Sequence, residues 1–187
     1  IWDFIEKRQA EMKAKSRPIE RLAVTCALEH FTAILAEAIL TSPELIEGFD
    51  PRVRAMWIWH AIEETEHKSV AFDVFEHVGG DYRTRIVAML FVTREFILNQ
   101  IQFHRKLMEA DGESRNVKSK ARGFLKYWGP RGVFTKLAPA YLEYFRRDFH
   151  PWQHDNRELV AKWKRYVEDQ AKRVVPQAGK AEVRQAA

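Results

Sequence analysis

The segment that decides the fold is His60-Ala61-Ile62-Glu63-Glu64-Thr65-Glu66-His67. At about 100° of rotation per residue, both histidines, Glu63 and Glu64 fall on one face of a helix. Apolar residues continue that face on both sides, namely Val53, Met56, Trp57, Ala71, Val74, Phe75 and Val78. Because an amphipathic helix turns such a stripe toward the core, the pattern predicts a long helix that carries four ionisable groups on its core face.

A lone carboxylate occupies a similar place in Ala27-Leu28-Glu29-His30-Phe31-Thr32. The helical face around Glu29 is mostly apolar and is made of Leu22, Thr25, Cys26, Ala33, Ala36 and Leu40. Glu29 is therefore expected to be buried. Burying an unpaired carboxylate costs more than a buried leucine returns, so a positively charged partner is needed. A metal ion is such a partner.

Carboxylate oxygens and neutral imidazole nitrogens suit Fe, Mn or Zn. Glu64 and His67, at i and i+3, present both kinds of donor from one helical turn. A Glu-x-x-His unit that meets a lone Glu from a neighbouring helix is the pairing found in carboxylate-rich helix bundles. The alternative is an ion-pair cluster on a solvated helix face, and the apolar stripe on both sides of the motif argues against it.

The composition is that of one helical domain. The chain has 187 residues, of which 46% are hydrophobic and 30% charged, enough for one sizeable core. Its single cysteine, Cys26, excludes a disulfide framework and favours the cytoplasm. The longest apolar run, 86–93, is too short to cross a bilayer, so no transmembrane segment is expected. Net charge is +5, with basic residues dispersed among acidic ones, so no nucleic-acid partner is expected.

Breaker residues divide the chain into helices. The expected long helices cover 2–15, 18–40, 51–78 and 82–110, with prolines near their starts and Gly79-Gly80 and Asp111-Gly112 as stops. Residues 113–150 should form short helices, and 154–174 a last amphipathic one. No alternating strand pattern or Gly-rich phosphate loop is present. We expect an all-α, ferritin-like antiparallel bundle with additional C-terminal helices, in one domain over 1–175, and a flexible tail at 176–187.

Several stretches resemble a bacterial family described as predicted metal-dependent hydrolase, a ferritin-like group. They are Glu20-Arg21-Leu22-Ala23, Ala27-Leu28-Glu29-His30-Phe31-Thr32-Ala33, Trp59-His60-Ala61-Ile62-Glu63-Glu64-Thr65-Glu66-His67-Lys68, Ala71-Phe72-Asp73-Val74-Phe75 and Phe149-His150-Pro151-Trp152. The resemblance covers most of residues 1–175 and implies a metal-binding helical domain. By this resemblance, Glu29, Glu64 and His67 are expected to be metal ligands. His60 and Glu63 become further ligands or partners of the ligands.

The chain departs from the family in the segment ahead of Ile1. Members usually carry two more helices there, with a Glu and a second Glu-x-x-His, so this sequence holds half of a dinuclear site. The start at a residue other than methionine favours a fragment of a longer protein. The alternatives are a second chain, as in a homodimer, or a site for one ion.

The leading hypothesis is a metal-dependent hydrolase that acts on a small-molecule substrate of unknown identity. The cofactor would be one or more divalent metal ions, with iron favoured and manganese or zinc as alternatives. Glu63 is the free carboxylate nearest the ligands and hence the candidate catalytic base. A di-iron oxidoreductase of the ferritin-like type needs the same ligands and is the runner-up. A third reading is a non-catalytic helical protein that binds metal or a partner.

Overall fold

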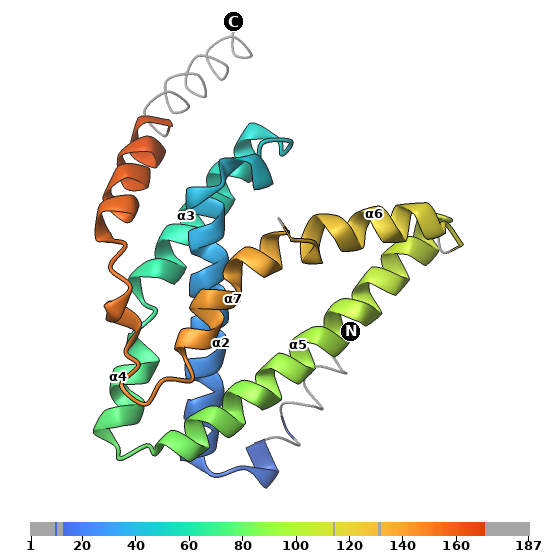
Figure 1. Ribbon diagram of the computed structural model, residues 1–187. Coiled ribbons are helices and arrows are strands. Elements are labelled where there is room, and N and C mark those ends of the chain that lie inside the picture. Colours follow the sequence, from blue (N-terminus) through green and yellow to red (C-terminus); the bar gives the residue numbers. More distant parts are fainter. Residues whose placement is uncertain (1–9, 11–12, 114, 131, 171–187) are drawn as a thin grey trace, which may run out of the picture.

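The computed structural model describes residue 10 and residues 13–113, 115–130 and 132–170 (Figure 1). Every regular element in these residues is helical, which confirms the all-α class. The elements are α2 (Pro18–Thr41), η1 (Pro43–Leu45), α3 (Pro51–Glu66), α4 (Val70–His77), α5 (Tyr82–Ala110), α6 (Val117–Trp128), α7 (Val133–Glu143), η2 (Pro151–Gln153) and a last helix over 157–170. The helix expected over 2–15 lies mostly outside the described residues. The tail expected at 176–187 lies wholly outside them.

Helix α2 is the central element, and α3, α4, α5 and α7 all pack against it (Figure 1). Pro18 supplies a preset backbone angle for its first turn. The Glu20 carboxylate accepts a hydrogen bond from the Arg17 backbone N–H at 2.8 Å, which satisfies a donor next to the helix start. The buried positions of α2 are mostly small residues, among them Ala23, Ala27 and Ala33. Small side chains let the neighbouring helices approach α2 closely.

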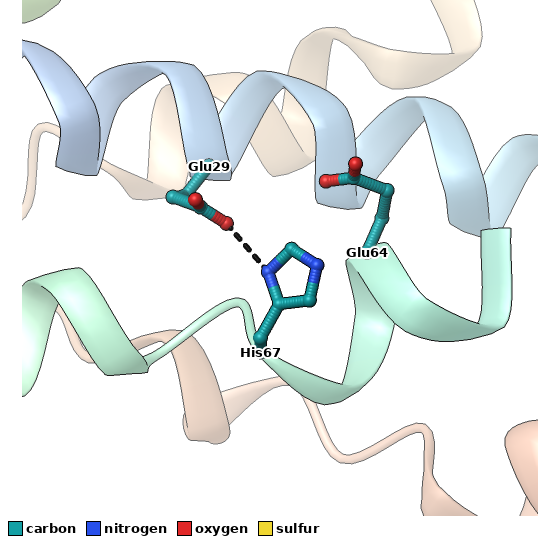
Figure 2. A group of neighbouring side chains, drawn as sticks. All are labelled: Glu29, Glu64 and His67. Carbon is teal, nitrogen blue, oxygen red and sulfur yellow. Dashed lines mark hydrogen bonds and ion pairs between the residues drawn. The ribbon is translucent and has the colours of Figure 1, made fainter. Parts of the chain in front are cut away.

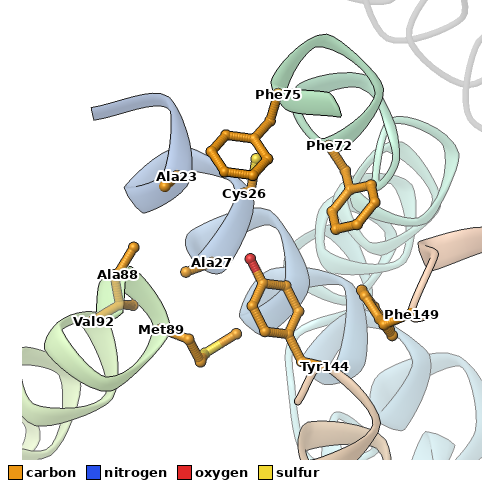
Figure 3. Packing of buried hydrophobic residues seen from close by; sticks show 10 residues of the cluster. All are labelled: Ala23, Cys26, Ala27, Phe72, Phe75, Ala88, Met89, Val92, Tyr144 and Phe149. Carbon is orange, nitrogen blue, oxygen red and sulfur yellow. The ribbon is translucent and has the colours of Figure 1, made fainter. Parts of the chain in front are cut away.

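Two apolar clusters hold the helices together. The larger one joins α2, α4 and α5 to the end of α7, and its largest side chains are Phe72, Phe75, Met89, Tyr144 and Phe149 (Figure 3). The second joins the C-terminal half of α2 to α3 and to the helix over 157–170, and it consists of Ala36, Leu40, Ile46, Ile58, Ala61, Ile62 and Val160. α3 thus turns Ile58, Ala61 and Ile62 toward the core.

The apolar stripe on α3 and α4, which was predicted to face the core, is largely exposed. Val53, Met56 and Trp57 are 42%, 54% and 38% exposed, and Val74 and Val78 are also exposed. The prediction that this whole face is buried is therefore wrong. Its physical reason is that α3 meets α2 through its Ile58 side, and no element among the described residues packs over the other side.

The prediction of one continuous helix over 51–78 is also wrong. α3 ends at Glu66 and α4 begins at Val70, so His67, Lys68 and Ser69 form a turn between two helices. Lys68 and Ser69 are each 5% exposed. Two polar side chains in a row are thus buried at this break. Ser69 Oγ donates to Asp73 Oδ2 of α4 at 2.9 Å, and the other partners of the two side chains must come from elsewhere in the chain.

Residues 149–156 supply those partners. The Lys68 ammonium group donates to the His154 backbone carbonyl at 2.6 Å, and the Trp152 indole N–H donates to Ser69 Oγ at 2.9 Å. The Lys68 Nζ also lies 4.6 Å from the centre of the Trp152 ring, within the range of a cation–π contact. These contacts between residues far apart in sequence stabilise the break.

By length and composition alone, two of the described helices, α2 and α5, are apolar enough to cross a membrane. This is weak evidence, because the core helix of a soluble protein passes the same test, and α2 is the core helix here. The expectation of no transmembrane segment stays a prediction.

Candidate metal site

Glu29 of α2 and Glu64 of α3 lie beside His67, which follows the last residue of α3 (Figure 2). One ligand atom from each side chain can be chosen so that all three atoms lie within 4.8 Å of one another. His67 Nδ1 is 2.8 Å from Glu29 Oε2. The structure therefore brings together a carboxylate and a Glu-x-x-His unit from two packed helices.

The burial of this triad is intermediate. The side chains of Glu64, Glu29 and His67 are 15%, 25% and 41% exposed. The expectation that Glu29 is buried is wrong in degree, because Glu29 stands at the edge of the buried face of α2. His30 next to it is buried, whereas Leu28 on its other side is 49% exposed. The triad is thus partly shielded from water and open on one side.

His60, the fourth candidate ligand, stands at the rim. Its Nε2 atom is 3.4 Å from Glu64 Oε1, and its side chain is 50% exposed. Its ring also meets the Trp57 ring edge-on, with 6.0 Å between centroids. His60 does not belong to the three-residue group whose ligand atoms converge. In this structure it touches a candidate ligand from the solvent side.

Glu63, the candidate catalytic base, is half-buried on α3 and lies within electrostatic reach of Lys164. The hydrogen bond from Lys164 to Glu66, at 2.6 Å, raises the pKa of Lys164, and the charge of Glu63 contributes. Glu63 therefore sits near the side of α3 that meets the helix over 157–170. Its assignment as base stays a prediction.

The donor set suits a divalent ion. Two carboxylates and one imidazole give three protein ligands, and three ligands leave coordination positions for water or a substrate. Ligand bonds of about 2.0–2.2 Å place two ligands of one ion roughly 3–3.5 Å apart. Glu29 Oε2 and His67 Nδ1, at 2.8 Å, would need only a small separation to admit an ion in place of the shared proton.

Two neighbours on α2 are not ligands in this geometry. Buried His30, whose sequence neighbour is Glu29, donates from Nε2 to the Ala140 carbonyl at 3.1 Å and so ties α2 to α7; burial lowers its pKa to about 4. Burial also raises the pKa of the Cys26 thiol to about 12. A thiol with so high a pKa is not a nucleophile at neutral pH.

Sequence reasoning missed the role of Lys68, which adjoins His67. Besides its bond to His154, the ammonium group donates to Asn156 Oδ1 at 2.9 Å, and His154 Nε2 lies 2.7 Å from Glu37 Oε1 of α2. The available signal was a lysine on the face that continues the apolar stripe, about 40° from Glu64 at 100° per residue. Such a lysine requires buried acceptors.

Comparison with known proteins adds one match. A family model described as predicted metal-dependent hydrolase matches residues 2–155, a range that includes Glu29, Glu64 and His67. No curated protein and no solved structure matches the chain. Since the matched range takes in most of the sequence, the chain belongs to the family of predicted metal-dependent hydrolases.

Proposed function

We propose that the protein is a metal-dependent hydrolase whose divalent metal ion is held by Glu29, Glu64 and His67. The observation that carries the proposal is the convergence of three ligand atoms from α2 and the end of α3 within 4.8 Å. The family description supports metal dependence and hydrolysis.

Each residue of the proposed site would have its own role in the reaction. A bound metal ion would supply an activated water molecule and polarise the substrate. Glu29 and Glu64 would neutralise the positive charge, and His67 would add a nitrogen donor. Glu63, as the nearby free carboxylate on α3, would accept a proton from water. The exposed side of the triad leaves a route for a small-molecule substrate.

A dinuclear centre in a ferritin-like bundle is the finer form of this proposal. One lone Glu with one Glu-x-x-His unit is half of the ligand set found in such bundles. The uncovered face of α3, with Met56 and Trp57 exposed, is where further ligand-bearing helices would pack. These would come from another segment of the protein or from a second copy.

A di-iron oxidoreductase is the second candidate. Its support is the pairing of a lone Glu with a Glu-x-x-His unit, which is the ligand pattern of di-iron carboxylate bundles. Oxygen consumption by the Fe²⁺-loaded protein, against ester and phosphoester hydrolysis by the Zn²⁺- or Mn²⁺-loaded protein, separates the two candidates.

Metal binding is tested by calorimetric titration of chelator-treated protein with Zn²⁺, Mn²⁺ and anaerobic Fe²⁺. We expect Glu64→Gln to weaken binding at least about tenfold, since a ligand is lost, and a ligand contributes no less than the partners that orient it. Glu66→Gln is the matched control, because it removes the same charge from the same helix at an exposed position. Equal affinity in both variants, or no binding by the wild-type protein, would overturn the proposal.

A further inference from the structure

Helix α6 has an apolar face that is largely exposed in the described structure. None of its residues is buried. Val117 is 75% exposed, Phe124 and Leu125 are each 64% exposed, and Trp128 is 51% exposed. Figure 1 shows α5 and α6 meeting at a tip, from which α6 runs back toward α7. The apolar side chains of α6 are therefore accessible from solvent.

The charges on α6 have one sign. At about 100° per residue, Val117, Phe124 and Trp128 share one face. Arg122 and Lys126 lie on the opposite face, and Lys118 and Lys120 lie on the two flanks, about 100° and 60° from Val117. No acidic residue occurs between Glu113 and Glu143. The basic residues in that interval are Arg115, Lys118, Lys120, Arg122, Lys126, Arg131 and Lys136. The expected dispersal of basic among acidic residues does not hold for this interval.

The helix is capped and anchored at both ends. Asn116 Oδ1 accepts a hydrogen bond from the Ser119 backbone N–H at 2.9 Å, which caps the start. At the other end, the Trp128 ring stacks on Phe134 of α7 with 4.7 Å between centroids, and Thr135 Oγ1 donates to the Trp128 carbonyl at 3.1 Å. α6 is thus held in place at its C-terminal end while most of its apolar face stays exposed, so binding would require little ordering.

We propose that α6 docks on an anionic lipid bilayer, with its apolar face in the interface and its basic residues at the phosphate headgroups. A strongly amphipathic helix with aromatic residues on one face and lysine and arginine on the other is the pattern of interfacial membrane helices. A second copy of the chain fits the surface less well, because it would bring like charges together. Nucleic acid would neutralise the charges but leave Phe124 and Leu125 in water.

The proposal is independent of the metal site and is tested by vesicle flotation. Phosphatidylcholine vesicles are used with and without phosphatidylglycerol, at low and high salt. Wild-type protein is expected to float only with the anionic vesicles and to be released by salt. The double variant Lys118→Gln/Lys126→Gln should bind about 30-fold more weakly. Lys162→Gln/Arg165→Gln, with the same change of net charge on the last helix, should bind as the wild type does.

The apolar contribution is tested by Phe124→Ser/Leu125→Ser, with Val70→Ser/Val74→Ser as the control at exposed positions of α4. Only the α6 variant should lose vesicle binding, and circular dichroism should show both folded. Failure of the wild type to float at low salt, or undiminished flotation of the α6 variant, would overturn the proposal. The proposal would also be overturned if the wild type failed to bind vesicles and instead sedimented as a dimer that the α6 variant abolishes.

Discussion

His30 makes the stability of the fold depend on pH in a range where most other side chains do not titrate. The residue is 8% exposed. Its Nε2 atom donates to the Ala140 carbonyl, and its ring packs against Tyr144 and Phe149 with centroid distances of 4.9 and 5.2 Å. Burial therefore lowers the pKa of His30 from 6.5 to about 4. The neutral imidazole is the form that the folded protein accommodates.

The sign of the effect follows from where each state takes up the proton. As pH falls below 6.5, the unfolded chain protonates at His30, but the folded protein does not until pH reaches about 4. The contribution of His30 is thus complete above pH 6.5 and is lost progressively between pH 6.5 and 4. Each unit by which the pKa differs between the folded and unfolded states corresponds to about 1.4 kcal/mol, so the free energy of unfolding falls by about 3 kcal/mol over this range. That is a large share of a typical domain's stability of about 5–15 kcal/mol.

The assay is urea unfolding followed by circular dichroism between pH 7 and pH 4. His30→Gln is the informative variant, because a glutamine amide can still donate to Ala140 but does not titrate. Carboxylate titrations occur in both proteins, so they cancel in the difference. We expect the wild type to lose about 3 kcal/mol more than the variant over this range. Parallel curves would refute the reasoning.

Two further substitutions test contacts that hold the fold around the site. Lys68→Met removes a buried ammonium group with two hydrogen bonds and leaves its acceptors unpaired, so the free energy of unfolding should fall by about 2–4 kcal/mol in urea titrations. Lys164→Met, at an exposed ion pair, should leave the free energy of unfolding nearly unchanged. Gly80→Ala would place a Cβ atom against the Phe75 ring, so the free energy of unfolding should fall by about 1–3 kcal/mol. In the control Gly48→Ala, the new Cβ atom has no neighbour within 4 Å, so no such steric loss is expected.

Helix boundaries could be predicted wherever local chemistry sets them. α5 begins after Asp81, whose side chain accepts a hydrogen bond from the Thr84 N–H at 3.0 Å, and it ends at Ala110, as the Asp111-Gly112 stop predicts. Pro18 and Pro51 likewise mark the first residues of α2 and α3. Caps and proline act within a few residues, so the sequence around them is sufficient.

The break between α3 and α4 could not be predicted, because its cause lies more than 80 residues away in sequence. The apolar stripe places Lys68 on a core face, but the acceptors that hold its ammonium group belong to residues 149–156. The exposure of Met56 and Trp57 escaped prediction for a related reason. An apolar stripe indicates a face that can be covered, but whether it is covered depends on other elements.

The partial exposure of the triad bears on the kind of metal site it can form. Structural sites are closed and fully coordinated, whereas catalytic sites keep a position for water or substrate. Without an ion, the hydrogen bond to His67 compensates Glu29, and the solvent that reaches Glu64 lowers the cost of its charge. A metal ion bound at this triad would be accessible from solvent. His67 is the first residue of the turn between α3 and α4. Lys68 and Ser69 of this turn are hydrogen-bonded to residues 149–156, so these contacts distant in sequence also set the position of His67. That arrangement fixes the position of His67, which is what the proposed catalytic centre requires.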